Sequence, residues 1–198
     1  AGGLGGAIWL VSFSEPTVIS NCAFQSNSAM MGGGIYNASG DAPWIIGSTF
    51  TRNFADGGGA IFHDGDCLVD NCRFLGNRAI NGGALLIYDP DTITTDSLFV
   101  DNTAQDGAVL ATAQNTSIFR CTMVENEAPE LGYAVTGWDT SINLSDCVLA
   151  QNSPAQFAED WFTATIAFSN VSGGVPPHCT DAGGNIHPDP QFVCSPSH

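Results

Sequence analysis

The 198-residue sequence has no lysine, and its four arginines oppose 20 aspartates and glutamates, which gives a formal net charge of −16. Nucleic acids and anionic membrane surfaces bind proteins through clustered positive charge, so this composition argues against both as partners. The sequence also lacks any run of 18 apolar residues. We therefore expect no insertion into a membrane.

Motifs for catalysis and metal binding are scarce as well. No HxH, HExxH or CxxC spacing occurs, although these spacings are typical of zinc sites. The densest acidic stretches are HDGD at 63–66 and DPD at 89–91. Weak candidates for Ca²⁺ ligands are the carboxylates of Asp64, Asp66, Asp89 and Asp91. The competing interpretation is that these are solvated turn residues. We predict that the protein needs no cofactor and is not an enzyme.

Glycine, in contrast, is abundant, and most of the 23 glycines belong to a repeat. One repeated phrase is a large apolar residue followed three positions later by asparagine, and successive copies lie 24 to 26 residues apart. These asparagines are Asn27, Asn53, Asn77, Asn102, Asn126 and Asn152. A second phrase follows about eight residues later: GGGI at 32–35, GGAI at 58–61, GGAL at 82–85 and DGAV at 106–109. A period this short leaves little room for paired helices and predicts a stack of β-strands.

Aligning the copies on asparagine gives columns of residues that a stacked solenoid would superpose. Three residues before asparagine stand Phe24, Phe50, Phe74, Phe99, Met123 and Leu149; five before stand Cys22, Ser48, Cys72, Ser97, Cys121 and Cys147. We expect the phenylalanines to form an aromatic ladder in the interior. Asparagine at a fixed corner tolerates left-handed backbone and can bond its own turn or its stacked neighbours. Glycine pairs would allow positive φ and close backbone approach.

Each repeat therefore supplies about three short strands, which make one coil of a parallel β-helix. The predicted fold is an all-β parallel β-solenoid of about six coils. The repeats cover residues 1–152, and a last partial coil with an irregular capping tail covers 153–198.

The alternation of FxxN with GGA[ILV] resembles the repeats of chlamydial polymorphic membrane protein passengers and of bacterial secreted right-handed parallel β-helix proteins. SNVSGG at 169–174 and GGNIHPDPQFV at 183–193 resemble the closing segment of the second group. The resemblance implies a right-handed coil. It specifies fold more than function, because these proteins include adhesins, surface structural proteins and polysaccharide-active enzymes.

The cysteines and glycosylation motifs are consistent with an extracellular or cell-surface location. We expect free thiols in the inward cysteine column and a disulfide between Cys179 and Cys194 that pins the tail. The sequon NxS/T occurs at Asn37, Asn115, Asn143 and Asn170, which are candidate glycosylation sites.

One apolar column is expected to face outwards. Trp9, Tyr36, Phe62 and Leu86 directly follow the aliphatic residue of the second phrase, with Leu110 in the next copy. Adjacent strand positions point to opposite faces, so one of the two columns must lie outside. Such a stripe can stack on sugar rings or bury against another subunit. Coverage by the chain's own segment Trp161–Phe168 is the other interpretation.

These features favour a non-enzymatic extracellular structural or adhesive element. Because the sequence begins inside a repeat, strand edges would be open to a second copy, and head-to-tail contact would form a filament. The competing interpretation is that the sequence is a fragment of a longer protein, or that its first coil was disordered or trimmed. The expected partner is the protein itself or a cell-surface glycan. The alternative is a polysaccharide-binding or polysaccharide-degrading module that uses the aromatic stripe or the acidic turns.

Overall fold

The computed structural model describes residues 3–11, 17–38, 42–88, 92–129, 133–158 and 162–188. Their regular structure consists of short β-strands in three parallel sheets, with no helix among them. The prediction of an all-β parallel solenoid of about six coils is confirmed.

Successive strands along the chain belong to different sheets, and each strand pairs with its equivalent one coil away. Sheet 1 contains β1 (Ile8–Leu10), β4 (Ile35–Asn37), β7 (Ile61–His63), β10 (Leu85–Ile87), β13 (Leu110–Thr112), β16 (Tyr133–Gly137) and β19 (Ala155–Phe157). Sheet 2 contains β2 (Val18–Ser20), β5 (Trp44–Ile46), β8 (Leu68–Asp70), β11 (Thr92–Thr95), β14 (Thr116–Phe119), β17 (Thr140–Ser145), β20 (Phe162–Ala167) and β22 (Thr180–Asp181). Sheet 3 contains β3 (Ala23–Gln25), β6 (Thr49–Thr51), β9 (Arg73–Leu75), β12 (Leu98–Val100), β15 (Thr122–Val124), β18 (Val148–Ala150) and β21 (Asn170–Val171).

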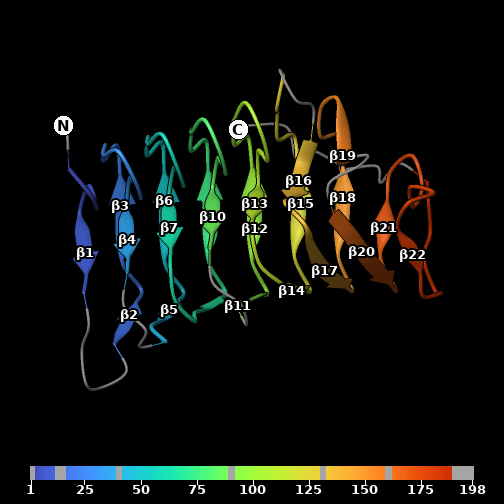
Figure 1. The fold of residues 1–198 in the computed structure, drawn as a ribbon, viewed down its shortest axis with the longest axis horizontal. Helices are drawn as coiled ribbons and strands as arrows, with labels where there is room; N and C mark the ends of the chain where they lie inside the picture. Colours follow the sequence, from blue (N-terminus) through green and yellow to red (C-terminus); the bar gives the residue numbers. More distant parts are fainter. Residues whose placement is uncertain are drawn as a thin grey trace, which may run out of the picture.

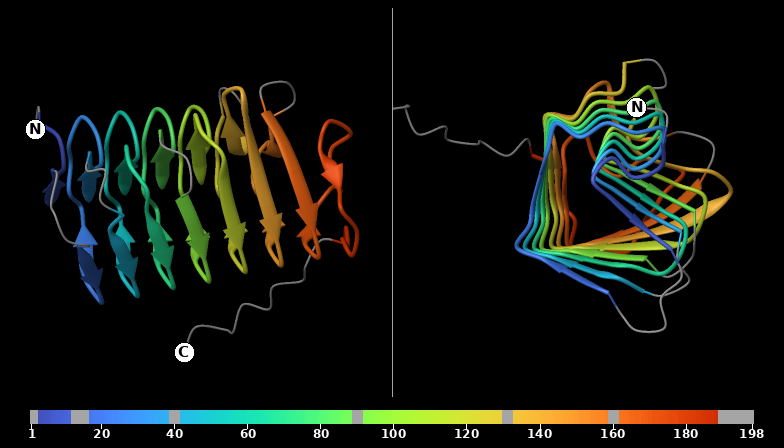
Figure 2. Two further views of the ribbon diagram at one scale, coloured as in Figure 1. Left: turned by 60° about the horizontal axis from the view of Figure 1, so that its bottom comes forward. Right: turned by 90° about the vertical axis from the view of Figure 1, so that its left-hand side faces the viewer.

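The coils stand in a row from the N-terminal to the C-terminal end (Figure 1) and superpose when viewed along the row (Figure 2). In most strands of sheets 2 and 3, a buried central residue lies between two more exposed neighbours. That alternation follows from the pleat, which sends successive side chains to opposite faces. The buried residues fill one continuous apolar interior between the sheets.

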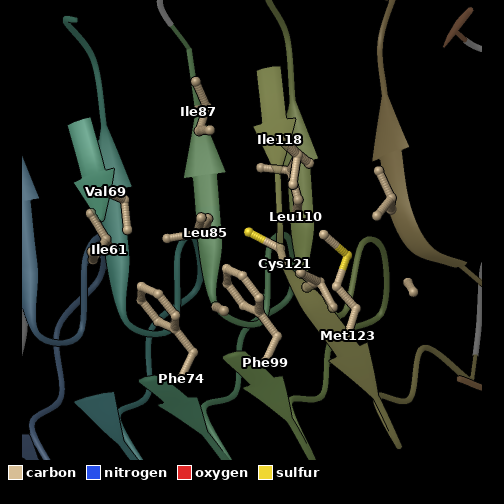
Figure 3. Close-up of a cluster of buried hydrophobic side chains, with 14 of the residues drawn as sticks. Ile61, Val69, Phe74, Leu85, Ile87, Phe99, Leu110, Ile118, Cys121 and Met123 are labelled. Atoms are coloured by element: carbon tan, nitrogen blue, oxygen red, sulfur yellow. The ribbon is translucent and has the colours of Figure 1, made fainter. Parts of the chain in front are cut away.

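The phenylalanine column forms the predicted ladder in this interior. Phe24, Phe50, Phe74 and Phe99 stack with ring centroids 4.7 to 5.0 Å apart and interplanar angles of 3 to 5°. Met123 continues the column, and Figure 3 shows it beside Phe74 and Phe99 under the inward side chains of the other sheets. The ring spacing matches the distance of about 4.8 Å between paired strands.

The asparagine column forms a second ladder. The backbone N–H and Nδ2 of Asn77 both donate to Oδ1 of Asn102 at 3.0 Å, and Nδ2 also donates to the carbonyl of Phe50 at 2.9 Å. Equivalent bonds join Asn27, Asn53, Asn102, Asn126 and Asn152. Each side chain thereby satisfies polar groups of two neighbouring coils, which an interior position requires.

The ladder asparagines tolerate left-handed backbone but do not adopt it. Positive φ values of 52 to 62° occur instead at the residue before each asparagine. These residues are Ser26, Arg52, Gly76, Asp101, Glu125 and Gln151. The preceding residue makes the turn because each asparagine must aim its amide inwards to form the ladder.

The glycine pairs behave as predicted. Gly58 has a φ of 62°, in the left-handed region that favours glycine. A Cβ on Gly59 would overlap the carbonyl oxygen of Gly83 in the next coil and lie 2.6 Å from the carbonyl oxygen of Arg78. Close stacking of this turn therefore excludes a side chain at the second position.

The cysteine and serine column lies at the corner between sheets 2 and 3. The N–H of Cys72 donates to Ser97 Oγ at 3.0 Å, and the N–H of Cys147 donates to Ser169 Oγ at 3.1 Å. Cys72, Cys121 and Cys147 are buried as predicted, but Cys22 is exposed because no described residue stacks on the outer side of its coil.

Strand stacking continues into the segment expected to be a partial coil and tail. β19, β20 and β21 form a further set of three strands, β22 pairs with β20, and Ile186 bridges to Asn170. Among the described residues there is no helix long and apolar enough to cross a membrane.

Candidate functional site

The expected outward stripe exists as a column of sheet 1, but it is exposed at only one end. Trp9, Tyr36, Phe62 and Leu86 are paired in register across β1, β4, β7 and β10. Trp9 is 57% exposed, Tyr36 is half-buried, and Phe62 and Leu86 retain 6% and 2% exposure. The stripe is therefore not the continuous platform that the sequence suggested.

The turn that follows each asparagine covers the middle of this stripe. Phe62, Leu86 and Ala111 form a small cluster with Met31 and Trp138. A Cβ on Gly57 would lie 2.7 Å from both Leu86 Cδ2 and Met31 Sδ, so this turn folds against the outer face of sheet 1. The cluster is apolar and separate from the main interior.

Two expectations about the stripe need correction. Segment Trp161–Phe168 does not cover it: Phe162, Ala164 and Ile166 belong to the main core, Phe168 is exposed, and Trp161 lies outside the described residues. The DGAV phrase at 106–109 was also aligned one residue out of register. Leu110 pairs with inward Leu85, so Ala111 takes the stripe position.

The rings of this column contact one another in series. Tyr36 and Phe62 stack at 4.9 Å and 6°, whereas Trp9 meets Tyr36 edge-on at 6.5 Å and Phe62 meets Tyr88 at 5.4 Å. Stacking covers the faces that Tyr36 and Phe62 turn towards each other, so the exposed ring surface is concentrated on Trp9 and Tyr88. Burial and the nearby Asp64 carboxylate raise the pKa of Tyr36.

A different apolar stripe, not expected from the sequence, lies on the outer face of sheet 2. Val18, Trp44, Leu68 and Ile93 pair in register across β2, β5, β8 and β11. Val18, Trp44 and Ile93 are 57%, 48% and 42% exposed, and Leu68 is half-buried. We call these four residues the sheet 2 stripe. In the sequence, each of the four directly precedes a residue that is buried: Ile19, Ile45, Val69 and Thr94.

Carboxylates surround the sheet 2 stripe. Asp66 is exposed just before β8, and Asp70 lies two residues after Leu68 on the same face. Arg120 is bound to Asp96 through contacts of 2.6 and 2.7 Å. Hydrogen bonds from Arg120 and Thr95 lower the pKa of Asp96. The bond to Asp96 raises the pKa of Arg120, and the nearby carboxylates of Asp146 and Asp70 add to this rise. The cation at this corner is already paired.

The candidate metal ligands do not converge among the described residues. Asp64 and Asp66 are exposed, and no group of three or more histidine, cysteine, aspartate or glutamate side chains in the described ranges could hold a metal ion. Asp89 and Asp91 lie outside the described residues.

His63 opens the HDGD turn but points into the interior. It is 2% exposed, and its Nδ1 lies 3.0 Å from Nδ2 of Asn37, which is also buried. Burial lowers the pKa of His63 to about 3. Its Nε2 has no hydrogen-bond partner in the described structure. The ring is neutral near pH 7 and is shielded from any solute.

No disulfide joins any two of the six described cysteines. The thiols of Cys121 and Cys147 donate to carbonyls of a neighbouring coil, those of Thr94 and Ile118, at 3.7 and 3.6 Å. Burial raises the pKa of Cys72 to about 11 and also raises the pKa of Cys121. Cys194 lies outside the described residues, so its bond to Cys179 stays a prediction.

The glycosylation candidates differ in exposure. Asn37 is fully buried and bonded to His63, so it cannot carry a glycan in the folded chain. Asn115 and Asn143 are exposed, whereas Asn170 is half-buried within β21. Glycosylation of Asn115 and Asn143 stays a prediction.

A pocket of about 660 Å³ opens between β19 and the segment 172–178. Its lining includes Gln156, Phe157, Val175, Pro177 and His178. Gln156 accepts a hydrogen bond of 2.6 Å from Asn152 at the end of the asparagine ladder. The described part of the lining contains no carboxylate, so these residues do not provide the paired acids that glycoside hydrolysis needs.

In a comparison with known families, the model described as a right-handed β-helix region matches residues 3–173. No curated protein and no solved structure matches the chain.

Proposed function

Because the chain belongs to the family of right-handed β-helix proteins, we propose that it is a non-enzymatic extracellular element with a structural or adhesive role. The observation that carries the proposal is the sheet 2 stripe, an apolar column on the outside of a regular solenoid. Contiguous exposed apolar surface on a soluble protein usually marks an interaction site. Repeated interior side chains, in contrast, are explained by stacking alone.

The interior chemistry supports a scaffold rather than a catalyst. His63 is neutral and buried, and burial raises the pKa of the interior thiols at Cys72 and Cys147 to about 11. A nucleophilic cysteine requires the opposite shift and access for its substrate. These groups therefore contribute to packing in the proposed protein.

Head-to-tail self-assembly forms the second part of the proposal. Among the described residues, β1, β2 and β3 each pair with one strand only, so a further coil can add along their free edges. Contact between two unlike ends repeats indefinitely and produces a filament. The protein itself is the proposed partner at these edges.

Light scattering after size exclusion, combined with electron microscopy, tests the assembly. The proposal predicts a mass that rises above the 20.6 kDa monomer with concentration. Lysines introduced at the exposed edge positions Ser20 and Ala23 should reduce it, because charge on an edge strand opposes pairing. The same pair introduced at Ser117 and Thr122, in the middle of sheets 2 and 3, is the control. A monomer at every concentration contradicts self-assembly.

Polysaccharide binding is the second candidate function, supported by the exposed rings of Trp9 and Tyr88 and the Asp64 carboxylate at the same face. A net charge of −16 disfavours uronate or sulfated polymers. A glycan array and a calcium-dependent lyase assay test this candidate. Binding lost in Trp9→Ala and Tyr88→Ala would support it, and no signal on any glycan would contradict it.

A further inference from the structure

The sheet 2 stripe has a chemistry that restricts its partner. It presents one aromatic and three aliphatic side chains across four consecutive coils, with half-buried Ile46 beside Trp44 on the same face. Aliphatic side chains offer no hydrogen bonds, so this surface gains binding energy mainly by excluding water. A sugar polymer needs ring faces and polar contacts, and this column supplies a single ring.

The charges beside the stripe are acidic. Asp66 and Asp70 flank Leu68, and Asp96 and Asp146 lie at the adjoining corner. Arg120, which shares that corner, is already bound to Asp96. A partner surface therefore meets the carboxylates of Asp66 and Asp70 at the rim of an apolar strip.

A second copy of the chain is poorly suited to this face. Both copies would carry the same carboxylates and a net charge of −16, so bringing the two faces together would oppose like charges. Complementary charge instead favours a surface with an apolar centre and a basic border.

We infer that the sheet 2 stripe is the docking face for a basic partner protein, whose apolar residues pack on Trp44 and Ile93 while its lysines or arginines meet Asp66 and Asp70. This inference rests on the proposed adhesive function, and it specifies the chemistry of the partner that the adhesive surface binds. Association at this face is accelerated by electrostatic attraction and weakened by salt.

The test measures binding of a short amphipathic leucine–lysine helix to the native protein and to two double variants. Trp44→Ser with Ile93→Ser converts the stripe to the kind of residue found at Ser117 in the same column. Phe54→Ser with Ile80→Ser is the matched control, since these side chains are 44% and 42% exposed on the turn between sheets 3 and 1. Circular dichroism verifies that both variants are folded.

The stripe variant should raise the dissociation constant at least about tenfold, and the control should change it less than about twofold. Asp66→Asn with Asp70→Asn should weaken binding about threefold or more, as should raising salt from about 0.05 to about 0.5 M. A leucine–glutamate helix should not bind.

Several results would overturn the inference. Equal dissociation constants for the stripe and control variants would show that the helix binds through net charge alone. Binding of the leucine–glutamate helix would remove the basic requirement. Stripe-dependent binding of a glucosamine oligomer without binding of the helix would assign the face to a glycan, and a stripe-dependent dimer would assign it to a second copy. If the protein forms filaments but does not bind the helix, this inference is contradicted and self-assembly stands. If the protein stays monomeric but binds the helix, self-assembly is contradicted and this inference stands.

Discussion

The first four coils and the later coils have the same interior but different exteriors. On the outer face of sheet 2, Val18, Trp44, Leu68 and Ile93 give way to Ser117, Asn143 and Thr165 in one continuous column. The inward neighbours are aliphatic on both sides of Thr94: Ile19, Ile45 and Val69 precede it, and Ile118, Leu144 and Ile166 follow. Stacking demands similar side chains inside every coil, whereas the outside is free to vary. Functional information therefore lies where the copies differ.

The largest expected loss of stability comes from the middle of the interior. Phe74→Ala removes a ring stacked between Phe50 and Phe99 and should cost about 3–5 kcal/mol in the free energy of unfolding. Phe24→Ala, at the end of the described ladder with one stacked neighbour, should cost less. Urea denaturation measures both, and equal losses would contradict a ladder whose stability is shared between neighbouring coils.

In the asparagine ladder, a substitution in the middle should again cost more stability than one at the end, and both losses should be smaller than those in the phenylalanine ladder. Asn77→Ala leaves the N–H and Nδ2 of Asn53 and the carbonyl of Phe50 without their partner and should cost about 2–4 kcal/mol. Asn27→Ala removes only a donor to Asn53 Oδ1 from a half-buried position and should cost about 1 kcal/mol. Thermal unfolding of both variants measures the ratio of the two losses in the free energy of unfolding. A larger loss at Asn27 would contradict the account.

His63 breaks the uniformity of the interior and should make stability depend on pH. Its pKa is about 3 when folded and about 6.5 when unfolded, so between these values the unfolded chain binds the extra proton. Stability from this group is complete above pH about 6.5 and is lost as the pH falls towards 3. At pH 4.5 the loss should be about 2–3 kcal/mol.

His63→Ile places there the residue type that Ile87 supplies in the next coil. The variant should lose less stability than the native protein between pH 7 and 4.5, as measured by urea denaturation at each pH. Parallel pH profiles for the two proteins would show that His63 is not the buried neutral group described here.

The smallest effect on stability should come from the exterior. Trp44→Ser with Ile93→Ser alters exposed side chains and should change the free energy of unfolding by no more than about 1 kcal/mol. Differential scanning calorimetry is the measurement. A loss comparable to that of Phe74→Ala would mean that the stripe belongs to the core.

The sequence predicts the interior well because stacking repeats it. Phe74 and Asn77 recur at the same place in each coil, and a repeated residue must satisfy the same neighbours. The sequence alone does not show that left-handed backbone falls on the residue before the asparagine, for example on Asp101. The place of the turn depends on which way the asparagine amide points. The amide points inwards because it bonds the asparagine of the neighbouring coil.

The exterior was predicted less well for a physical reason. Phe62 and Leu86 have the composition of an outward stripe, but the turn containing Met31 and Gly57 folds over them. The path of that turn depends on packing between residues of successive coils, which a single repeat does not specify. Trp44 and Ile93 were overlooked because each looks like an isolated outward residue until register places them in one column.

The central claim is that the stripe on the outside of the first four coils, rather than the repeated interior, carries function. The most direct test is the ratio of dissociation constants for the leucine–lysine helix between Trp44→Ser with Ile93→Ser and Phe54→Ser with Ile80→Ser. The account predicts a ratio of at least about ten. A ratio near one, with both variants folded, would contradict it.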